Sequence, residues 1–524
     1  MYTHALTSAT AKENGAYYTP LPVAESLVRF AVRTPEDRLL DPACGDGRFI
    51  ALHVNSVGVE RDVPAARKAC ERAPNAKVRR GDFFQWAEST NERFDCAAGN
   101  PPFIRYQRFA GETRERALRF CRGLGVSFSG LTSSWAPFLV AAAALLRQGG
   151  RLAFVVPASI GHAPHAAPLI EYLVGHFNRV RVVAVRKKLF PHLSEDCWIL
   201  LADGFGGATE HIEFVQVDCF HGFEDRLAHD SYKPVPVRAW RDTWRSRLRP
   251  YLLDDTARSL YLNAAQSRSS VRLGEIASVG IGYVTGDNSF FHLRPSEIER
   301  WEVPTNFVHP TVRNSRLLPS EVLHPKTIKD WWQSDQPAFL LRIPKRANLP
   351  SAVESYLNST RGEKARHAYK CRSRKPWYSV PDVQVPTFFL TYMSGAMPSL
   401  VRNDAAATCT NALHAVHLNN DRDADRLLQS WRSPYLKLSC EIEGHPLGGG
   451  MLKLEPKEAA RLLIPPAKPL PFGPEAEIHD AISTLRSWRH YDRTARTAQR
   501  HQPLRIYRSG ACRSSFARFG HPDP

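Results

Sequence analysis

The stretch LLDPACGDGRF, residues 39–49, decides the fold of this chain. It has the pattern of a short apolar strand that runs into a glycine turn and then into a helix. Glycine lets the backbone come close to a ligand, and the start of a helix offers free N–H groups. Nucleotide-like cofactors bind at such points, outside the carboxyl ends of parallel strands. Alone, the stretch is equally consistent with a plain tight turn, so its interpretation depends on the sequence around it.

Short apolar runs alternate with helix-like segments from about Arg38 to Gly204. This alternation predicts an α/β fold with one doubly wound sheet of seven strands covered by helices. One expected helix runs from Ser134 to Arg147 and ends at Gly149-Gly150, because glycine tolerates the left-handed conformation at a helix end. The expected strands are 38–44, 56–60, 77–82, 94–100, 151–157, 179–185 and 197–203.

Composition changes along the chain and predicts its domain organisation. After about Gly222 the sequence becomes rich in arginine and tryptophan and then loses its strand-helix alternation. The following region carries many turn residues and one strongly basic stretch, 361–378, which indicates a binding domain. Nine arginines follow from Arg486 onward, as in a basic tail. The expected parts are a first domain at 1–235, a linker at 236–270, a mixed α+β binding domain at 271–470 and a basic tail at 471–524.

The charge balance points to a polyanionic partner. The 524 residues include 70 Lys and Arg against 52 Asp and Glu, a net charge of +18. Such an excess favours nucleic acid or an anionic membrane surface as the partner. The longest apolar run, 135–146, is shorter than the ~20 residues that span a bilayer. We expect no membrane span, no secretory signal, and a reducing cytoplasmic location.

The cysteines carry no visible metal or disulfide pattern. Ten cysteines are scattered singly, without a CxxC pair. This spacing argues against structural zinc and against a disulfide framework. We therefore expect free thiols and no metal centre.

Acidic residues follow three successive predicted strands. Asp41, Glu60 and Asp82 each lie at a strand end, and Phe83 follows the third. An acid after the second strand can accept the hydroxyls of a ribose. Asp82 can accept a hydrogen bond from an adenine amino group while Phe83 covers the ring. Each carboxylate alone is equally consistent with a helix N-cap or a solvated turn, but together they predict a site for an adenosine with a charged tail.

The tetrapeptide Asn100-Pro101-Pro102-Phe103 directly follows the fourth predicted strand. Proline fixes φ, so the turn is rigid. An exocyclic base amine is a poor nucleophile because its lone pair is delocalised into the ring. Two fixed acceptors, the Asn100 side-chain oxygen and the Pro101 carbonyl, would favour a pyramidal nitrogen whose lone pair can point at an electrophile. Phe103 then offers a face on which an extruded base can stack.

With these motifs the sequence resembles the amino-methylating DNA methyltransferases that use S-adenosylmethionine. The order resembles their gamma class, the Taq-type adenine enzymes, in which cofactor motifs come first and a target-recognition domain comes last. The family's N-terminal motif matches 15–20 (GAYYTP), its glycine loop matches 41–49 and its catalytic motif matches NPPF. Shorter matches lie at 281–288, 392–394 and 448–454. The resemblance implies a Rossmann-like seven-stranded methyltransferase sheet.

The resemblance also implies a role for each matched residue. Asn100, Pro101, Pro102 and Phe103 would be catalytic, and Phe190 would be the second aromatic that stacks on the flipped base. An aromatic before Pro191 is more often simple packing, so both interpretations of this residue stay open. The implied cofactor residues are Tyr18, Thr19, Asp41, Ala43, Gly45, Gly47, Glu60, Asp82 and Phe83.

The implied activity is site-specific methylation of adenine N6 in double-stranded DNA by base flipping. The resemblance implies a modification enzyme of a type II restriction-modification system that protects host DNA from a cognate endonuclease, acts as a monomer and lies at the prokaryotic nucleoid. Cytosine C5 chemistry is excluded because it needs a thiolate nucleophile and the chain contains no Pro-Cys pair.

Three alternatives remain at this point. One is an N-methyltransferase acting on RNA or on a protein glutamine, since these nitrogens are similarly delocalised. Another is a methylase fused to, or acting with, a nuclease, because 381–382 and 455–457 imitate pieces of a metal-dependent nuclease site. The last is a catalytically silent module that only binds DNA.

Overall fold

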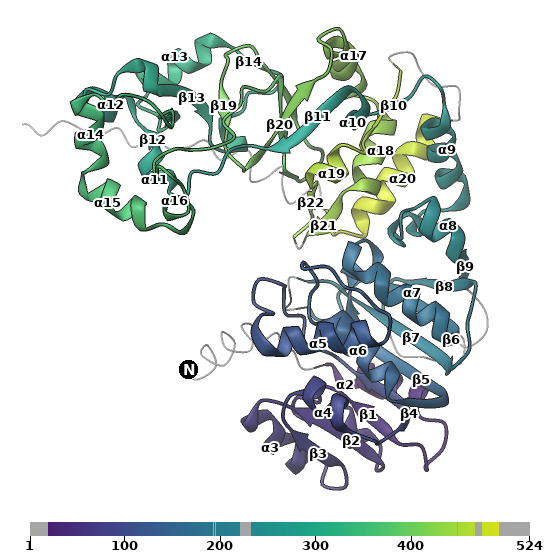
Figure 1. The fold of residues 1–524 in the computed structure, drawn as a ribbon. Coiled ribbons are helices and arrows are strands. Elements are labelled where there is room, and N and C mark those ends of the chain that lie inside the picture. Colours follow the sequence, from purple (N-terminus) through teal and green to yellow (C-terminus); the bar gives the residue numbers. More distant parts are fainter. Residues whose placement is uncertain are drawn as a thin grey trace, which may run out of the picture.

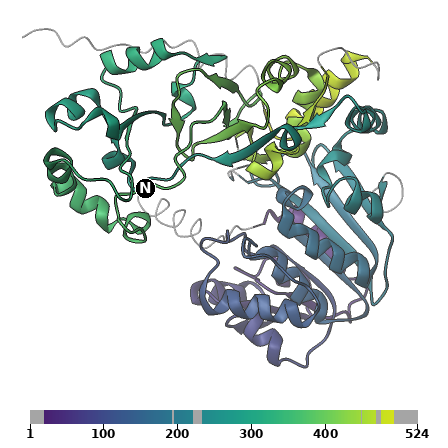
Figure 2. The same cartoon turned by 45° about the horizontal axis from the view of Figure 1, so that its top comes forward.

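The computed structural model contains two lobes, an α/β lobe that begins the chain and a mixed α+β lobe that follows it (Figure 1). A view rotated by 45° shows the same two bodies joined along one side (Figure 2). Within the described part of the chain, no helix is long and apolar enough to cross a membrane. The structure describes residues 19–191, 193, 195–220, 232–447, 449–466 and 474–491.

One nine-stranded sheet forms the first lobe, in the order β3-β2-β1-β4-β5-β7-β6-β8-β9. All seven predicted strands are present as β1 to β7. Strands β1 to β5 pair in parallel, and β7 runs antiparallel to both of its neighbours. The bounds are β1 Leu39–Asp41, β2 Ser56–Glu60, β3 Lys77–Arg80, β4 Phe94–Gly99, β5 Leu146–Pro157, β6 Phe177–Val185, β7 Cys197–Phe205, β8 His211–Val217 and β9 Lys233–Pro236.

The strand count differs from the expected seven because β8 and β9 extend the sheet beyond β6. Strand β8 pairs in parallel with β6, and β9 pairs antiparallel with β8. Two of the four residues of β9 are prolines, Pro234 and Pro236. Proline cannot donate to a ladder and is tolerated at an edge, so this strand has no strand-like signature in the sequence.

Helices cover both faces of this sheet, as the alternation predicts. Successive β1 residues enter different cores: Leu39 packs with α2 and Leu40 packs with α4 to α7. Asp62 and Asp82 begin α3 and α4 as N-caps, each accepting a backbone N–H. The helices are α2 Leu21–Ala31, α3 Val63–Arg72, α4 Phe83–Ser89, α5 Gly111–Gly123, α6 Trp135–Ala144 and α7 Ala167–His176.

Helix α6 is shorter than predicted. It ends at Ala144, and β5 already begins at Leu146. Phe94 and Cys96 of β4 pair with Leu146 and Arg151, so the register shifts here. Gly149, with φ of +76°, lies inside this irregular part of the strand. The pair Gly149-Gly150 therefore lies in an irregular part of a strand and does not form the C-cap of a helix.

The segment expected to be a linker, 236–270, is helical and belongs to the core of the first lobe. It contains α8 (Val237–Asp242), a 3₁₀ turn (Arg249–Leu252) and α9 (Asp255–Gln266). Trp240 is fully buried in the same apolar cluster as the sheet residues. The first part of the expected tail is also ordered: α20 (Glu475–Ser487) packs on α9 and on α18 of the second lobe. From residue 492 onward the expected tail lies outside the described residues.

The second lobe contains several small sheets, in agreement with the mixed α+β expectation. Its largest sheet has the order β11-β20-β16-β18-β14. The strands are β10 Val271–Arg272, β11 Ala277–Ile281, β12 His292–Leu293, β13 Val308–Val312, β14 Val322–Leu323, β15 Phe339–Leu341, β16 Phe388–Thr391, β17 Met393–Ser394, β18 Leu400–Asn403, β19 Thr408–Cys409, β20 Leu413–Leu418, β21 His445–Leu447, β22 Met451–Lys453 and β23 Leu463–Ile464. The helices are α10 Leu273–Ile276, α11 Asn288–Phe291, α12 Pro295–Arg300, α13 Pro325–Gln333, α14 Ser351–Leu357, α15 Thr360–His367, α16 Tyr369–Arg372, α17 Asp423–Ser430, α18 Pro434–Glu443 and α19 Pro456–Ala459.

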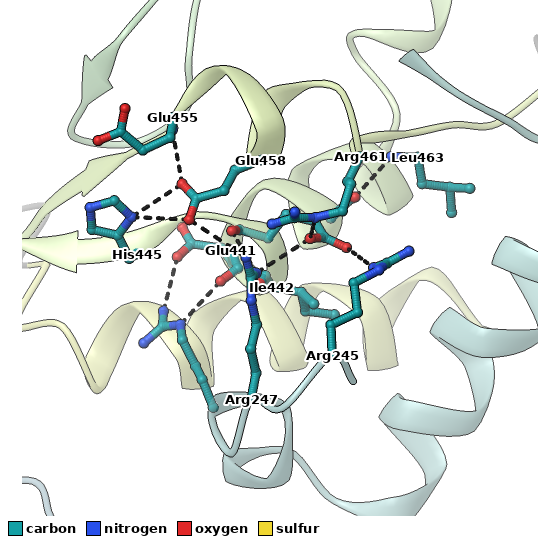
Figure 3. Close-up of polar contacts among 12 residues, drawn as sticks. Arg245, Arg247, Glu441, Ile442, His445, Glu455, Glu458, Arg461 and Leu463 are labelled. Carbon is teal, nitrogen blue, oxygen red and sulfur yellow. Dashed lines mark hydrogen bonds and ion pairs between the residues drawn. The ribbon is translucent and has the colours of Figure 1, made fainter. Parts of the chain in front are cut away.

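A network of buried charges joins the segment after α8 to the second lobe (Figure 3). Arg247 lies 3.3 Å from Glu443 of α18 and 3.5 Å from Glu458 of α19. His445 of β21 lies 3.1 Å from Glu458 and stacks on His162 of the first lobe. Removing one partner of a buried pair leaves an uncompensated charge, so this network fixes how the lobes meet.

Replacing Trp240 with alanine tests whether 236–270 is part of the first core. We expect the Trp240→Ala variant to lose about 3–5 kcal/mol of unfolding free energy, because a large buried ring is removed. Urea unfolding followed by circular dichroism measures this loss. The control is Arg238→Ala on the same helix, whose side chain is 93 % exposed. Equal stability of the two variants would contradict the assignment.

Candidate functional site

The parallel register places the ends of β1, β2 and β4 at one edge of the sheet. Leu40 of β1 lies opposite Val57 of β2 on one side and Ala97 of β4 on the other. The residues at these strand ends are therefore neighbours, and they include Asp41, Glu60 and the Asn-Pro-Pro turn. Asp82 follows β3, which pairs in parallel with β2. The structure thus brings together the two groups of residues that the sequence singled out.

Asp41 is a buried carboxyl group at the end of β1. It is 1 % exposed, and its Oδ1 accepts a hydrogen bond from the Ala43 amide at 3.1 Å. Burial, together with the charges of Glu60 and Asp46, raises the pKa of Asp41 to about 8. A cation bound beside Asp41 would lower this pKa and stabilise the ionised form. The position therefore suits the positively charged part of a ligand.

Gly99, which the sequence reasoning missed, makes room for Asp41. A Cβ at Gly99 would lie 2.6 Å from the Asp41 Oδ1 atom. A side chain at the end of β4 would therefore displace the carboxylate. The signal was present in the sequence as the glycine directly before Asn100.

Glu60 is tied to the glycine turn. Its two carboxylate oxygens accept backbone N–H bonds from Gly45 at 3.0 Å and from Asp62 at 2.6 Å. These bonds fix the carboxylate while leaving further lone pairs for ligand hydroxyls. Gly45 has φ of +55°, and a Cβ there would meet no described atom within 4 Å. Gly47 differs, because a Cβ would lie 2.8 Å from the Ala69 Cα, so it permits close packing on α3.

Asp82 and Phe83 have structural partners at the start of α4. Asp82 caps the helix through the Gln85 amide at 3.0 Å and also accepts from the Thr113 hydroxyl at 3.0 Å. Phe83 is 3 % exposed and stacks on Phe138 of α6 with ring centroids 5.4 Å apart. The N-cap interpretation of Asp82 is thus confirmed, while its role toward an adenine stays a prediction.

Of the N-terminal motif, only Thr19 and Pro20 lie within the described residues. Thr19 is buried, and its carbonyl accepts from the Arg48 guanidinium at 2.7 Å, which ties it to the glycine turn. Ala43 lies half-buried in that turn. Tyr18 lies outside the described residues, so its predicted role stays a prediction.

Ser134, at the start of α6, holds the Asn-Pro-Pro-Phe turn through three hydrogen bonds. Its hydroxyl donates to the Pro102 carbonyl and accepts from the Ile104 amide at 2.9 Å. Its backbone N–H donates to the Ile104 carbonyl at 3.0 Å. Ser134 is fully buried, so these bonds are shielded from water. The sequence reasoning missed this residue, which lies 32 positions after Pro102.

The two predicted aromatics, Phe103 and Phe190, pack against the same apolar cluster. Phe190 is 7 % exposed, whereas Phe103 is half-buried and also contacts the larger core. The packing interpretation of Phe190 is therefore confirmed, and a contact between Phe190 and a base stays a prediction. Asn100 and Pro102 are half-buried and Pro101 is buried.

No group of three or more His, Cys, Asp or Glu side chains among the described residues is arranged to hold a metal ion. Of the two stretches that imitate a nuclease site, 455–457 has structural partners: Glu455 takes part in the capping box of α19 and pairs with Lys453. The nine described cysteines are free.

Three protein-family models match consecutive parts of the chain. They are N-6 DNA methylase at residues 2–65, Eco57I restriction-modification methylase at 58–190, and the C-terminal domain of type II methyltransferase M.Eco57I at 245–498.

Similar proteins of comparable length include two named type II methyltransferases. M.AccI of Acinetobacter calcoaceticus is 18 % identical over 87 % of this chain and 86 % of its own. M.XamI of Xanthomonas campestris pv. amaranthicola is 23 % identical over 86 % of this chain and 85 % of its own. Among solved structures, the DrdV–DNA complex has a TM-score of 0.50 and 11 % identity over 84 % of this chain. This chain spans only 56 % of DrdV.

The raised pKa of Asp41 predicts that the affinity for S-adenosylmethionine, the cofactor expected from the sequence, depends on pH. Below pH 8 the Asp41 carboxyl group of the ligand-free protein is mostly neutral and must ionise beside the cation, so acidification weakens binding by up to about tenfold per pH unit. Calorimetric titration from about pH 6 to about pH 9 measures this dependence. The reference is the Asp41→Asn variant, whose side chain does not ionise and therefore adds no pH dependence to the affinity. Identical pH profiles of the two proteins would contradict the role of Asp41.

Removing the Ser134 hydroxyl is expected to loosen the turn. We expect Ser134→Ala to lower kcat about 10- to 100-fold, because a small misplacement of reacting groups has effects of this size. KM for DNA and affinity for S-adenosylmethionine should change less than about threefold. The matched control is Ser127→Ala on an exposed loop. A fall in cofactor affinity without a fall in kcat would show that Ser134 does not position the turn.

Proposed function

This chain is a type II DNA methyltransferase of the restriction-modification kind, and from this premise we propose that it transfers a methyl group from S-adenosylmethionine to adenine N6 in double-stranded DNA. The observation that carries the proposal is the fixed Asn100–Phe103 turn at the end of β4, beside the acid-bearing ends of β1 and β2. The match to an N-6 DNA methylase family supports the choice of nitrogen.

The residues around the glycine turn fit S-adenosylmethionine. Asp41 would face the charged methionine part, since its buried carboxyl group gains from a nearby cation. Glu60 would accept the ribose hydroxyls, because its carboxylate is already oriented by two backbone amides. The open space in front of Gly45 leaves room for the ligand. When bound, the cofactor supplies a methyl group on a positively charged sulfur.

The target amine would be held by two oxygens of the turn. The Asn100 side-chain oxygen and the Pro101 carbonyl accept its two hydrogens and leave the nitrogen lone pair directed toward the methyl group. Proline restricts the backbone at 101 and 102, and Ser134 fixes the next carbonyl. Because these acceptors are in place before reaction, little reorganisation is needed in the transition state. After transfer, the same oxygens hold the amine protons until one leaves to water.

Adenine N6 is paired with thymine inside a duplex, so the base must leave the stack before it can enter this site. Phe103 is the half-buried aromatic that follows the acceptors in the turn, and its ring would stack on the extruded purine. The extrusion step is part of the proposal.

The second lobe would hold and read the DNA. Helices α15 and α16 and the residues after them form a basic surface with Arg361, Lys364, Arg366, Lys370, Arg372 and Lys375. Tyr369 is 70 % exposed beside them, and Arg366 lies over the Trp377 ring at 5.4 Å. Cations of this kind contact phosphates, whereas base edges set the sequence preference. We propose that the chain acts as a monomer that protects host DNA from a cognate endonuclease.

Expression in a bacterial host that lacks DNA methylation tests the proposed function directly. Single-molecule sequencing of the host DNA is expected to show N6-methyladenine at one recurring motif. Methylation of a cytosine amine at that motif, in place of adenine, would contradict the adenine assignment. Unmodified DNA together with methylated RNA or protein would contradict DNA as the substrate.

Replacing Asn100 separates catalysis from cofactor binding. Asn100→Ala should lower turnover by at least about 1000-fold, because an electrostatic acceptor of the transition state is lost. Its affinity for S-adenosylmethionine should stay within about threefold of the original. The exposed Asn75→Ala variant provides the matched control in the same methyl-transfer assay. Loss of both turnover and cofactor binding would show that Asn100 is structural.

A further inference from the structure

We propose that a cavity between α18, α20 and the loop after β17 binds a backbone phosphate of the DNA. The inference rests on the proposed function, since it takes DNA as the substrate, and it adds a contact outside the methyl-transfer site. The lining of the cavity, the charges behind it and its position relative to the loop that carries Phe190 support it.

The cavity is lined by cationic and hydroxyl-bearing side chains. Its volume is about 600 Å³, which lies within the range of ligand sites in proteins. Among the residues that the structure describes, no carboxylate lines it. The lining residues are Ala396, Met397, Lys437, His479, Ile482, Ser483, Arg486, Ser487 and Tyr491.

The charges behind the cavity are unbalanced. Glu441, 1 % exposed, is the carboxylate partner of three arginines: Arg249 at 3.5 Å, Arg486 at 3.1 Å and Arg489 at 2.7 Å. Burial lowers the pKa of Arg249 to about 10, which still leaves it charged at neutral pH. One negative charge therefore faces three positive ones next to the cavity.

The neighbouring part of the same network does not supply the missing negative charge. Arg245, Arg247 and Arg461 each form an ion pair with Glu443. Arg247 also lies near Glu458 (Figure 3). Glu458 is in turn shared with His445. The six arginines of the whole network thus share three glutamates, and the excess of positive charge extends to the cavity.

Lys437 adds a further positive charge on the cavity wall. It is half-buried on α18. Among the described residues its ammonium group has no ion pair and no side-chain hydrogen bond, and the same is true of the His479 ring. A partly desolvated cation without an acid is unfavourable unless an anion binds it. Lys437 is therefore a cation on the cavity wall with which an anion could pair.

The cavity lies next to the loop that carries Phe190. Tyr491 of the cavity follows His490, whose Nε2 is 3.2 Å from the Asp196 Oδ1 atom of that loop. On the other side, Arg489 donates to the Gly395 carbonyl at 2.7 Å, directly before the cavity residue Ala396. A duplex whose target base enters the site beside Phe103 and Phe190 would pass close to this cavity.

A phosphodiester fits this chemistry. The cations and the hydroxyls of Ser483 and Tyr491 can donate to phosphate oxygens, whereas the Ser487 hydroxyl already donates to the Thr484 carbonyl at 2.8 Å. Met397 and Ile482 offer apolar contact for a sugar. A free phosphorylated molecule has the same chemistry, so the test must separate the two sources.

Binding of the full chain to double-stranded DNA as a function of salt tests the proposal. Fluorescence anisotropy at several KCl concentrations gives the slope of log K against log [KCl]. For Lys437→Ala we expect affinity at low salt to fall about tenfold for all sequences, and the slope to become shallower by about 1, because one phosphate contact is lost. The control is Lys68→Ala, an exposed lysine of α3, which should match the original protein.

A second variant distinguishes a loss of DNA binding from a loss of folding. Ser483→Glu places a carboxylate at an exposed position of the cavity rim and should weaken DNA binding at least as much, with an unchanged thermal midpoint. The proposal is overturned if both variants keep the slope of Lys68→Ala. It is also overturned if inorganic pyrophosphate binds in a Lys437-dependent way while the DNA slope is unaffected. Either of these results would contradict the phosphate site but not the proposed adenine methylation. A protein that binds no DNA at any salt concentration would contradict both proposals.

Discussion

The parallel register of β1, β2 and β4 is the constraint on which the rest of this structure depends. Because these strands end at one edge, Asp41, Glu60 and Asn100 lie together although 59 positions separate the first from the last. A slip of one residue would move every strand side chain to the opposite face of the sheet. Leu39 and Leu40 lie in two different apolar cores on the two faces of the sheet.

The two halves of the site are prepared in different ways. At β1, a buried carboxyl group with a raised pKa favours a cationic ligand. At β4, prolines restrict the turn, and Ser134 holds the Pro102 carbonyl and the Ile104 amide that follow the two acceptor oxygens. The fixed carbonyl dipoles of the turn and the buried Asp41 carboxyl group are both in position before the ligands bind. The protein therefore needs little reorganisation during the reaction. The excess of arginines between the lobes is also in place before DNA binds. Its positive charge attracts the phosphates of the DNA backbone.

Much of the fold and of the site could be predicted from the sequence because the signals are local. Most of the strands β1 to β7 coincide with apolar runs, although β3 is the polar stretch KVRR, and Asn100–Phe103 is a contiguous motif. The misses are not local: Ser134 acts on a turn 32 residues away. Strand β9 is a proline-containing edge strand, and the predicted linker is helical because Trp240 finds its core partners in distant strands. Such contacts depend on tertiary packing between residues that are far apart in the chain, so a short stretch of sequence does not reveal them.

The most direct test of the central claim is a structure of the protein with DNA and a non-reactive analogue of S-adenosylmethionine. The account predicts an extrahelical adenine whose N6 lies about 3 Å from both the Asn100 side-chain oxygen and the Pro101 carbonyl oxygen. An adenine that stays paired in the duplex, or an N6 atom beyond hydrogen-bonding distance of both oxygens, would contradict it.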